Sequence, residues 1–229
     1  MNLLLPFVGR EKEIARLQRL HTQRNHALIL GPAGVGKSAL VAHLRERQPL
    51  VLCSQTETLG GICNNFGVEL NSPAPHLPLV RRKNRLIKLL AESRRKVVFD
   101  DVDWTTPKIS SFLESVMEHV PVWICTRSEL ARDIGHFWPL LARFEKVELR
   151  PFCFSETNRL LAAAIESGQI TPSVKLFARQ LHRLSGGLPL ALVQLIEQFA
   201  AGHYDLSRRA SLQLLELDRR INNLPSLAV

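Results

Sequence analysis

Gly31-Pro32-Ala33-Gly34-Val35-Gly36-Lys37-Ser38 is the stretch of this sequence that decides the fold. It follows an apolar run typical of a strand and precedes a segment with helical periodicity. Glycines at these positions let backbone N–H groups curl around phosphate oxygens, and the N-terminus of the helix adds positive potential. Lys37 can reach terminal phosphates, and the Ser38 hydroxyl can bind Mg²⁺. The eight residues together predict a phosphate loop between a strand and a helix.

Polar side chains follow two further apolar runs, at the points where strands would end. We expect Asp100 to ligate Mg²⁺ through water and Asp101 to polarise the attacking water. Many ATPases carry the longer Glu at the position of Asp101. The sequence therefore does not predict whether hydrolysis is fast or slow with the shorter Asp. Thr126 and Arg127 end the next strand, where Arg127 can contact a γ-phosphate by a charge-assisted hydrogen bond. A loop arginine without a ligand is the alternative for Arg127.

Short apolar runs alternate with helical patterns up to residue 150, which is typical of a parallel sheet with crossover helices. Strands are expected at 26–30, 50–54, 97–101, 120–126 and 146–149, and helices at 11–21, 37–47, 78–95, 108–119 and 130–141. After Pro151 only helical patterns follow, at 155–167, 172–184 and 189–201, and the tail over 205–223 could form one more helix. We therefore expect a parallel-sheet α/β P-loop domain of the ASCE type over residues 1–150. A small all-helical lid with a C-terminal helix should occupy residues 151–229.

The chain has 229 residues and a formal net charge of +9, from 30 Lys and Arg against 21 Asp and Glu. Most of this excess lies in residues 81–96, where apolar residues recur at helical spacing and predict an amphipathic helix with a basic outer face. Clustered cations of this kind bind nucleic-acid backbones, and a merely solvated helix face is the alternative. The candidate nucleic-acid residues are Arg81, Arg82, Lys83, Arg85 and Lys88. Because no aromatic residues are interleaved with them, we expect non-specific contact with the DNA backbone.

Several classes of protein are excluded by composition. The apolar fraction of 45% is too high for a disordered chain, and no run of residues is long and apolar enough for a membrane span. The first residues lack the basic leader of a signal peptide, so we expect a cytoplasmic protein. The four cysteines form no C-x-x-C pair and have no histidine at zinc-finger spacing, which favours free thiols over a metal site.

The motifs occur in an order that resembles the AAA+ and STAND branch of P-loop ATPases, particularly the NB-ARC, origin-recognition-like and transposition-regulator ATPases. Phe7-Val8-Gly9-Arg10-Glu11 is similar to the hhGRxxE element, and Asp100-Asp101-Val102-Asp103-Trp104 to the Walker B "DDVW" with one inserted residue. Cys125-Thr126-Arg127 matches the sensor "TTR" at two of three positions, and residues 147–161 resemble the strand and linker that enter the lid. Gly186-Gly187-Leu188-Pro189-Leu190-Ala191 reproduces the lid motif "GGLPLA". The resemblance covers residues 6 to about 200.

This resemblance implies further site residues. Val8, Gly9 and Arg10 would lie beside the adenine of ATP, and Pro189 would pack against the base. Arg143 resembles the arginine finger of oligomeric relatives, with Arg132 as second choice and a surface arginine as the alternative for both. Pro189 stands where many AAA+ proteins carry a sensor arginine, so that route of sensing is not expected here. The sequence shows no winged-helix domain and no "MHD" element, and we do not expect a complete STAND receptor.

Two functions are compatible with these residues. The first is an ATPase that binds ATP and Mg²⁺ between the α/β domain and the lid, forms a homo-oligomer with ATP, and acts on DNA as a loader or target selector. The second is an NB-ARC-like switch that holds a separate partner protein and turns over ATP slowly, without a role on DNA. The shorter Asp101 and the GGLPLA motif favour the second, and the basic helix favours the first.

Overall fold

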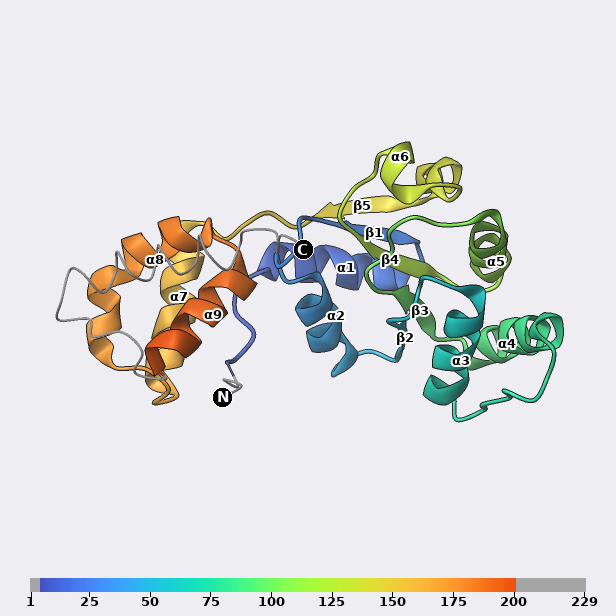
Figure 1. Ribbon diagram of the computed structural model, residues 1–229, viewed down its shortest axis with the longest axis horizontal. Helices are drawn as coiled ribbons and strands as arrows, with labels where there is room; N and C mark the ends of the chain where they lie inside the picture. Colours follow the sequence, from blue (N-terminus) through green and yellow to red (C-terminus); the bar gives the residue numbers. More distant parts are fainter. Residues whose placement is uncertain (1–4, 201–229) are drawn as a thin grey trace, which may run out of the picture. The chain divides into compact units, whose positions relative to one another are not determined.

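The computed structural model describes residues 5–200, so the expected tail helix at 205–223 lies outside the described residues. Five parallel strands form one sheet in the order β2-β3-β4-β1-β5 (Figure 1). The strands are β1 (Ala27–Leu30), β2 (Leu50–Cys53), β3 (Lys96–Phe99), β4 (Val122–Thr126) and β5 (Glu145–Glu148). This arrangement confirms the expected parallel α/β P-loop fold. It also places β4 between β1 and β3, which brings the ends of these three strands together.

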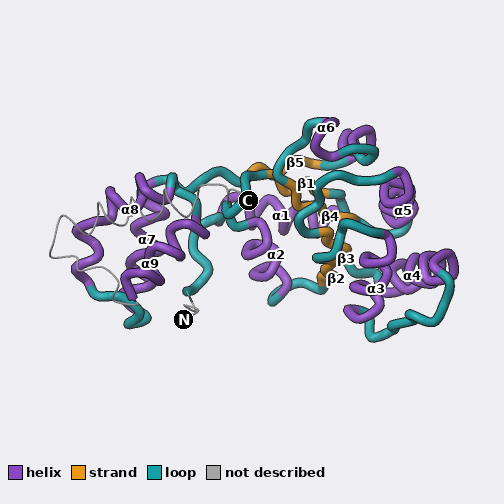
Figure 2. Tube along the Cα trace, viewed as in Figure 1, coloured by secondary structure: helices purple, strands orange, loops and turns teal. Residues whose placement is uncertain are grey.

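Helices cover both sides of the sheet, with α1 and α2 on one side and α3, α4 and α5 on the other (Figure 2). Side chains of the strands alternate accordingly: Leu28 and Ile124 belong to the core beneath α3, α4 and α5. The helices are α1 (Glu11–Gln23), α2 (Lys37–Arg45), α3 (Leu59–Glu69), α4 (Leu79–Ser93), α5 (Pro107–Met117) and the short α6 (Ala131–Ile134), followed by the 3₁₀ turn η1 (Trp138–Arg143). In residues 5–200, no helix is long and apolar enough to cross a membrane.

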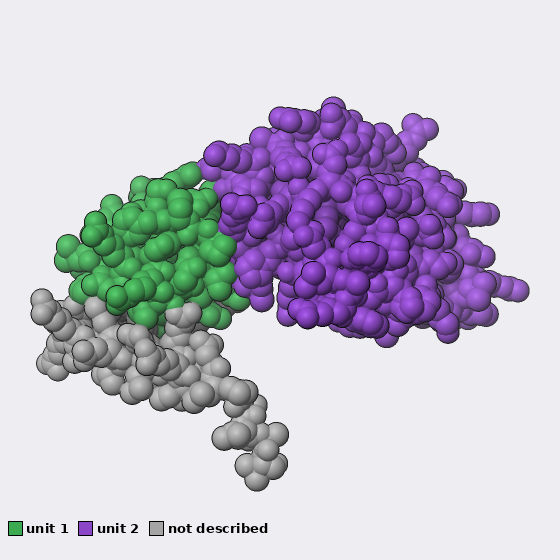
Figure 3. All heavy atoms as spheres, turned by 90° about the horizontal axis from the view of Figure 1, so that it is seen from above, with its two compact units in different colours: residues 1–9, 151–229 green, residues 10–150 purple. Residues whose placement is uncertain are grey.

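The chain divides into two compact units, residues 10–150 and residues 5–9 with 151–200 (Figure 3). The second unit contains α7 (Phe154–Glu166), the 3₁₀ turn η2 (Pro172–Phe177), α8 (Ala178–Ser185) and α9 (Pro189–Ala200). Its apolar core includes Leu161, Leu181, Leu192 and Ile196, and Val8 packs against it. Residues 5–9 therefore belong with the helical unit, whereas the sequence-based division had placed them in the α/β part.

Helix α3 was not expected from the sequence. The segment contains three glycines and two asparagines, which are weak helix formers. Its Thr58 cap accepts a hydrogen bond from the Gly61 amide at 3.0 Å, and Ile62 and Phe66 are fully buried. Burial against the sheet therefore outweighs the low intrinsic propensity of this segment.

Two segments expected as single helices are broken in the structure. The expected helix 130–141 divides into α6 and η1 at Gly135, which has φ +70° and forms a bridge with Thr105. A Cβ at Gly135 would lie 2.7 Å from the Thr105 carbonyl oxygen, so only glycine fits there. The expected helix 172–184 begins as the 3₁₀ turn η2 and continues as α8.

The basic helix is shorter than the sequence predicts, because Lys96 does not belong to it. Helix α4 ends at Ser93, and Lys96 is the first residue of β3, with only 4% of its surface exposed. Its Nζ donates a hydrogen bond to the Leu20 carbonyl oxygen at 2.7 Å and lies 5.2 Å from the centroid of the Trp123 ring. Burial, followed by repulsion from Arg24, lowers the pKa of Lys96 from 10.5 to about 8. This cation supports the core and is not available to a ligand.

We expect the free energy of unfolding to rise as the pH increases from about 8 to 10.5 because of Lys96. In this window the unfolded chain binds more protons at Lys96 than the folded chain does, so raising the pH favours folding by up to about 1.4 kcal/mol per pH unit. Urea unfolding of the wild type and of Lys96→Met across this range measures the effect. Equal slopes for the two proteins would contradict the assignment.

Candidate functional site

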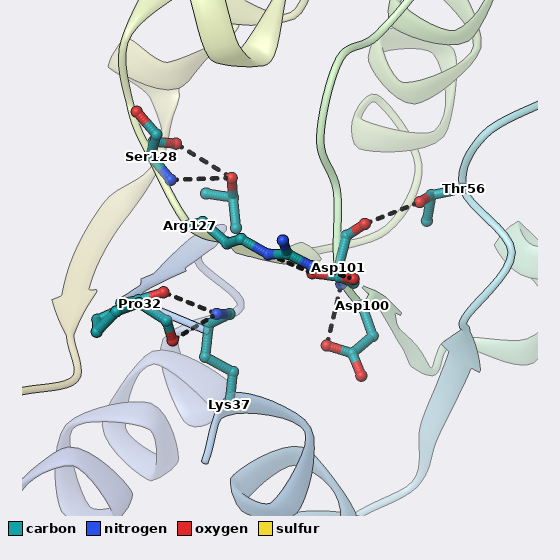
Figure 4. Close-up of polar contacts among 9 residues, drawn as sticks. Pro32, Lys37, Thr56, Asp100, Asp101, Arg127 and Ser128 are labelled. Carbon is teal, nitrogen blue, oxygen red and sulfur yellow. Dashed lines mark hydrogen bonds and ion pairs between the residues drawn. The ribbon is translucent and has the colours of Figure 1, made fainter. Parts of the chain in front are cut away.

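The phosphate loop connects β1 to α2, and its lysine is held inside it. Lys37 is the first residue of α2 and is 7% exposed, and its Nζ donates hydrogen bonds to the carbonyl oxygens of Gly31 at 2.7 Å and Pro32 at 3.2 Å (Figure 4). Burial lowers the pKa of Lys37, while Asp101 and Asp100 act in the opposite direction. The ammonium is therefore pre-positioned at the loop, within the electrostatic field of both carboxylates.

The glycines of the loop serve two different purposes. Gly34 and Gly36 have φ values of +75° and +99°, a region that favours glycine. Gly31 is required by packing, because an added Cβ would lie 2.6 Å from the carbonyl oxygen of Leu149, the residue that follows β5. The close approach of Gly31 to Leu149 fixes the start of the loop against the residue that follows β5.

The carboxyl edge of the sheet gathers the other predicted groups, because Asp100 and Asp101 follow β3 and Thr126 ends β4 (Figure 4). The Asp101 carboxylate accepts hydrogen bonds from Arg127 Nε at 3.3 Å and from Arg127 Nη2 at 3.0 and 3.2 Å. This hydrogen bonding raises the pKa of Arg127. About half of each side chain is exposed, so the pair is screened by solvent and contributes about 0–1 kcal/mol to stability.

Asp101 adopts a left-handed backbone conformation, with φ +53°. Asp and Asn tolerate this region better than longer side chains. Its amide donates to Asp100 Oδ1 at 3.0 Å, and its carbonyl oxygen accepts a hydrogen bond from Thr56 Oγ1 at 3.1 Å. The left-handed turn gives a physical reason for Asp at a position where many ATPases carry Glu.

Thr56 is a site residue that the sequence analysis missed. It follows β2 and is 8% exposed, with its hydroxyl directed at the backbone of Asp101 (Figure 4). The signal that could have found it is its place just beyond the carboxyl end of a strand, where parallel sheets position functional groups.

Arg10 contacts the phosphate loop in this structure. It is 4% exposed, has φ +68° ahead of α1, and donates from Nη2 to the Val35 carbonyl oxygen at 3.0 Å. The guanidinium therefore holds the backbone of the phosphate loop at Val35. Its predicted place beside adenine stays a prediction, as do those of Val8, Gly9 and Pro189, which belong to the helical unit.

The residues of the loop fit a nucleoside triphosphate with Mg²⁺. The loop ends on a nine-residue helix with no acid in its first turn, whose first amides have no carbonyl partner within the helix. The Ser38 hydroxyl and the Asp100 carboxylate supply the hard oxygen donors that Mg²⁺ prefers. In residues 5–200, no three His, Cys, Asp or Glu side chains cluster as a metal site. Mg²⁺ bound largely through phosphate and water oxygens does not require such a cluster.

Arg143 lies away from the phosphate loop of its own unit, and Arg132 lies on the exposed surface of α6. Arg143 ends η1, just before β5, and the backbone of Glu145 bonds to His26 at the start of β1. This is the edge of the sheet opposite the phosphate loop, because all strands are parallel. Arg132 is 81% exposed beside Asp133. The roles of both residues as arginine fingers toward a neighbouring subunit stay predictions.

The five candidate nucleic-acid residues lie on α4 but do not share one face. Arg81, Arg85 and Lys88 are exposed and follow one another at helical spacing. Arg82 turns toward α3 and donates to Asn64 Oδ1 at 3.1 Å, and Lys83 is half-buried. The outward basic stripe therefore consists of Arg81, Arg85 and Lys88, with Arg85 also donating to a loop serine.

We expect Asp101→Asn to leave ATP affinity within about threefold while lowering kcat by a factor on the order of 10² to 10⁴. Asn keeps the left-handed backbone but cannot accept a proton from water. Steady-state turnover with a separate binding titration measures both quantities. The matched control is Asp103→Asn, which removes a nearby charge that we assign no role. Equal turnover in wild type and Asp101→Asn would remove Asp101 from the chemistry.

The parallel sheet, the phosphate loop after β1 and the paired carboxylates after β3, at the same edge of the sheet, define a phosphate-loop nucleotide-binding protein. Residues 6–124 match the model of the AAA ATPase domain, and the chain belongs to this family.

Three known proteins are similar to this chain, one in sequence and two in structure. The chaperone protein ClpB of Mycobacterium leprae is 29% identical over 143 residues, which are 61% of this chain and 15% of ClpB. The Aeropyrum pernix Orc1 protein, solved in complex with DNA, aligns with a TM-score of 0.67 and 18% identity over 93% of this chain and 66% of Orc1. A Pyrococcus horikoshii STAND protein with a tetratricopeptide repeat sensor aligns with a TM-score of 0.52 and 22% identity over 84% of this chain and 30% of that protein. The two structural likenesses show the fold alone, and the chain spans only part of the length of each of the three proteins.

Proposed function

We propose that this chain binds ATP with Mg²⁺ at the phosphate loop, hydrolyses it, oligomerises in the ATP state and acts on DNA as a loader or target selector. The observation that carries the ATPase part is the edge of the sheet where Lys37, Asp101 and Arg127 meet. Phosphoryl transfer to water requires cations beside the phosphates and a carboxylate beside the attacking water. Lys37, at the N-terminus of α2, and Arg127 supply the cations, and Asp101 supplies the carboxylate.

The roles of the residues follow from their placement. The loop backbone and Lys37 would bind and orient the phosphates, and Ser38 with Asp100 would hold Mg²⁺, which supplies charge neutralisation at the phosphate oxygens. Asp101 would orient a water molecule and accept its proton. Arg127 must exchange its contact with Asp101 for a contact with phosphate before Asp101 can act. This exchange would couple the presence of the terminal phosphate to the activation of water.

The DNA part of the proposal is supported by the outward stripe of Arg81, Arg85 and Lys88 and by the likeness of the fold to a protein solved with DNA. We expect Arg81→Glu with Lys88→Glu to weaken duplex binding and to lower the slope of log affinity against log salt by about 2, since each lost phosphate contact removes about 0.9.

Fluorescence anisotropy with a labelled duplex at several salt concentrations measures this slope. Arg16→Glu with Arg19→Glu, two exposed cations of α1, is the control with the same change in charge. If both double variants keep the wild-type slope, α4 is not part of a DNA interface.

The proposed function is tested by steady-state ATP hydrolysis while duplex DNA is titrated in at two salt concentrations, with Lys37→Ala as the blank. We expect turnover to rise with DNA and the rise to fade at the higher salt, because the contact is electrostatic. Turnover that is slow and indifferent to DNA, despite nucleotide binding, would overturn the DNA part and leave the nucleotide site intact.

A second candidate is a nucleotide-gated interaction switch with slow turnover. The bidentate contact between Arg127 and Asp101 favours it, because it occupies the carboxylate that hydrolysis needs. In that case α4 would dock an acidic protein surface. Slow hydrolysis unaffected by DNA is the result that this candidate predicts.

A further inference from the structure

An open groove lies within the helical unit, apart from the phosphate loop. It has a volume of about 700 Å³ and runs between α7 on one side and η2 with α8 on the other. Its lining residues are Phe154, Asn158, Arg159, Ala162, Lys175, Leu176, Ala178, Arg179 and Gln180. Phe154, Asn158 and Ala162 recur every fourth residue, so one face of α7 forms a continuous wall.

The two walls of the groove are fixed to each other. Thr157 Oγ1 of α7 and His182 Nδ1 of α8 are hydrogen-bonded at 2.8 Å. The ring of Phe154 packs edge-on against His182, with 5.7 Å between ring centroids. Behind the walls, Leu161 and Leu181 are fully buried in the core of this unit. The groove is therefore a preformed feature of packed helices, which lowers the entropic cost of binding to it.

Charge and apolar surface occur together in this groove. Arg159, Lys175 and Arg179 supply three positive charges to the lining, and none of the lining residues that the structure describes carries a carboxylate. Leu176 is 80% exposed and Phe154 is 37% exposed. Large side chains exposed beside a charged rim are typical of surfaces that bind another protein.

We propose that this groove docks an acidic segment of a partner protein that also carries apolar side chains. The carboxylates of the segment would pair with Lys175 and Arg179, and its apolar side chains would cover Leu176 and Phe154. A nucleic-acid backbone could use the cations, but it would leave both apolar side chains uncovered. A polypeptide of mixed acidic and apolar character satisfies both halves of the lining. This proposal is independent of the nucleotide site and of α4.

The test uses labelled model peptides and fluorescence anisotropy with the full chain. The probe is a peptide of repeated Glu-Glu-Leu-Leu units, compared with Glu-Glu-Ser-Ser and Lys-Lys-Leu-Leu repeats of equal length. We expect the first peptide to bind at least about tenfold more tightly than the other two, because it alone meets both the charge and the apolar surface.

Three variants locate the binding. Lys175→Glu with Arg179→Glu should weaken binding of the Glu-Glu-Leu-Leu peptide by about tenfold or more, and Leu176→Ser by about threefold or more. Arg183→Glu changes an exposed arginine of the same helix that does not line the groove, and should change affinity by less than about twofold. All of these side chains are exposed, so far-UV circular dichroism should show an unchanged fold.

The proposal is overturned by any of three results. The first is that the Glu-Glu-Leu-Leu peptide does not bind at all. The second is that Arg183→Glu weakens it as much as the groove variants do. The third is that duplex DNA or the Glu-Glu-Ser-Ser peptide binds equally well and Leu176→Ser has no effect, which would make the groove a surface for polyanions. Loss of ATP hydrolysis in Lys37→Ala with unchanged peptide binding separates this proposal from the proposed function.

Discussion

Replacing Lys37 by Ala is expected to weaken ATP binding by a factor on the order of a hundred or more. The Lys37 ammonium is buried and is already held at the phosphate loop by the carbonyl oxygens of Gly31 and Pro32. Nothing else on the loop brings a full positive charge to phosphate. Isothermal titration with ATP and Mg²⁺ measures the loss.

Alanine at position 37 also removes two hydrogen bonds to the loop, so folding must be checked by thermal unfolding. Lys96→Met is a matched control, since it removes another buried lysine of the same unit that bonds to a backbone carbonyl. We expect this control to keep the wild-type affinity for ATP. Unchanged affinity in Lys37→Ala would refute the assignment of the nucleotide site.

Gly187→Ala is expected to destabilise the helical unit by about 3 kcal/mol or more. Gly187 has φ +71°, and a Cβ there would overlap the carbonyl oxygen of Phe152. The same turn carries the hydrogen bond from the Phe152 amide to the Gly187 carbonyl oxygen at 2.7 Å. Alanine therefore strains the backbone and separates the two segments that this bond joins. Hydrogen exchange of α8 and α9, together with urea unfolding, measures the loss.

The neighbouring Gly186 provides the control for this prediction. It also has a positive φ, of +60°, but a Cβ there would meet nothing within 4 Å. Gly186→Ala should therefore cost only the backbone strain, about 1–2 kcal/mol. If the two variants lose equal stability, the contact with Phe152 is not the reason for glycine at position 187. The comparison also tests the physical basis of the Gly186-Gly187 pair in the GGLPLA motif.

The fold and the core of the site could be predicted because their signals are local. The phosphate loop needs glycines at fixed spacing between a strand and a helix, and the chain encodes all of this within eight residues. Asp100, Asp101 and Arg127 could be placed at one edge because the carboxyl ends of parallel strands share that edge. The parallel sheet and membership of the AAA ATPase family agree with these inferences.

Local signals were not sufficient where burial or a distant backbone decides the structure. Helix α3 forms from poor helix formers because Ile62 and Phe66 are buried against the sheet. Gly135 interrupts an expected helix because the Thr105 backbone, thirty residues earlier in the chain, lies against it. In both cases a contact distant in sequence outweighs a preference of less than about 1 kcal/mol per residue.

The sequence by itself determined that this protein has a parallel α/β fold with a phosphate loop, since periodicity and loop chemistry depend on neighbouring residues. Only the tertiary structure decided which charged residues are available to act. Lys96 and Arg82 read as part of one basic helix, but the first is buried in β3 and the second bonds to α3. Likewise, the contact of Arg127 with Asp101 joins the ends of two strands. Such availability depends on burial and on partners brought together by folding, which no local pattern encodes.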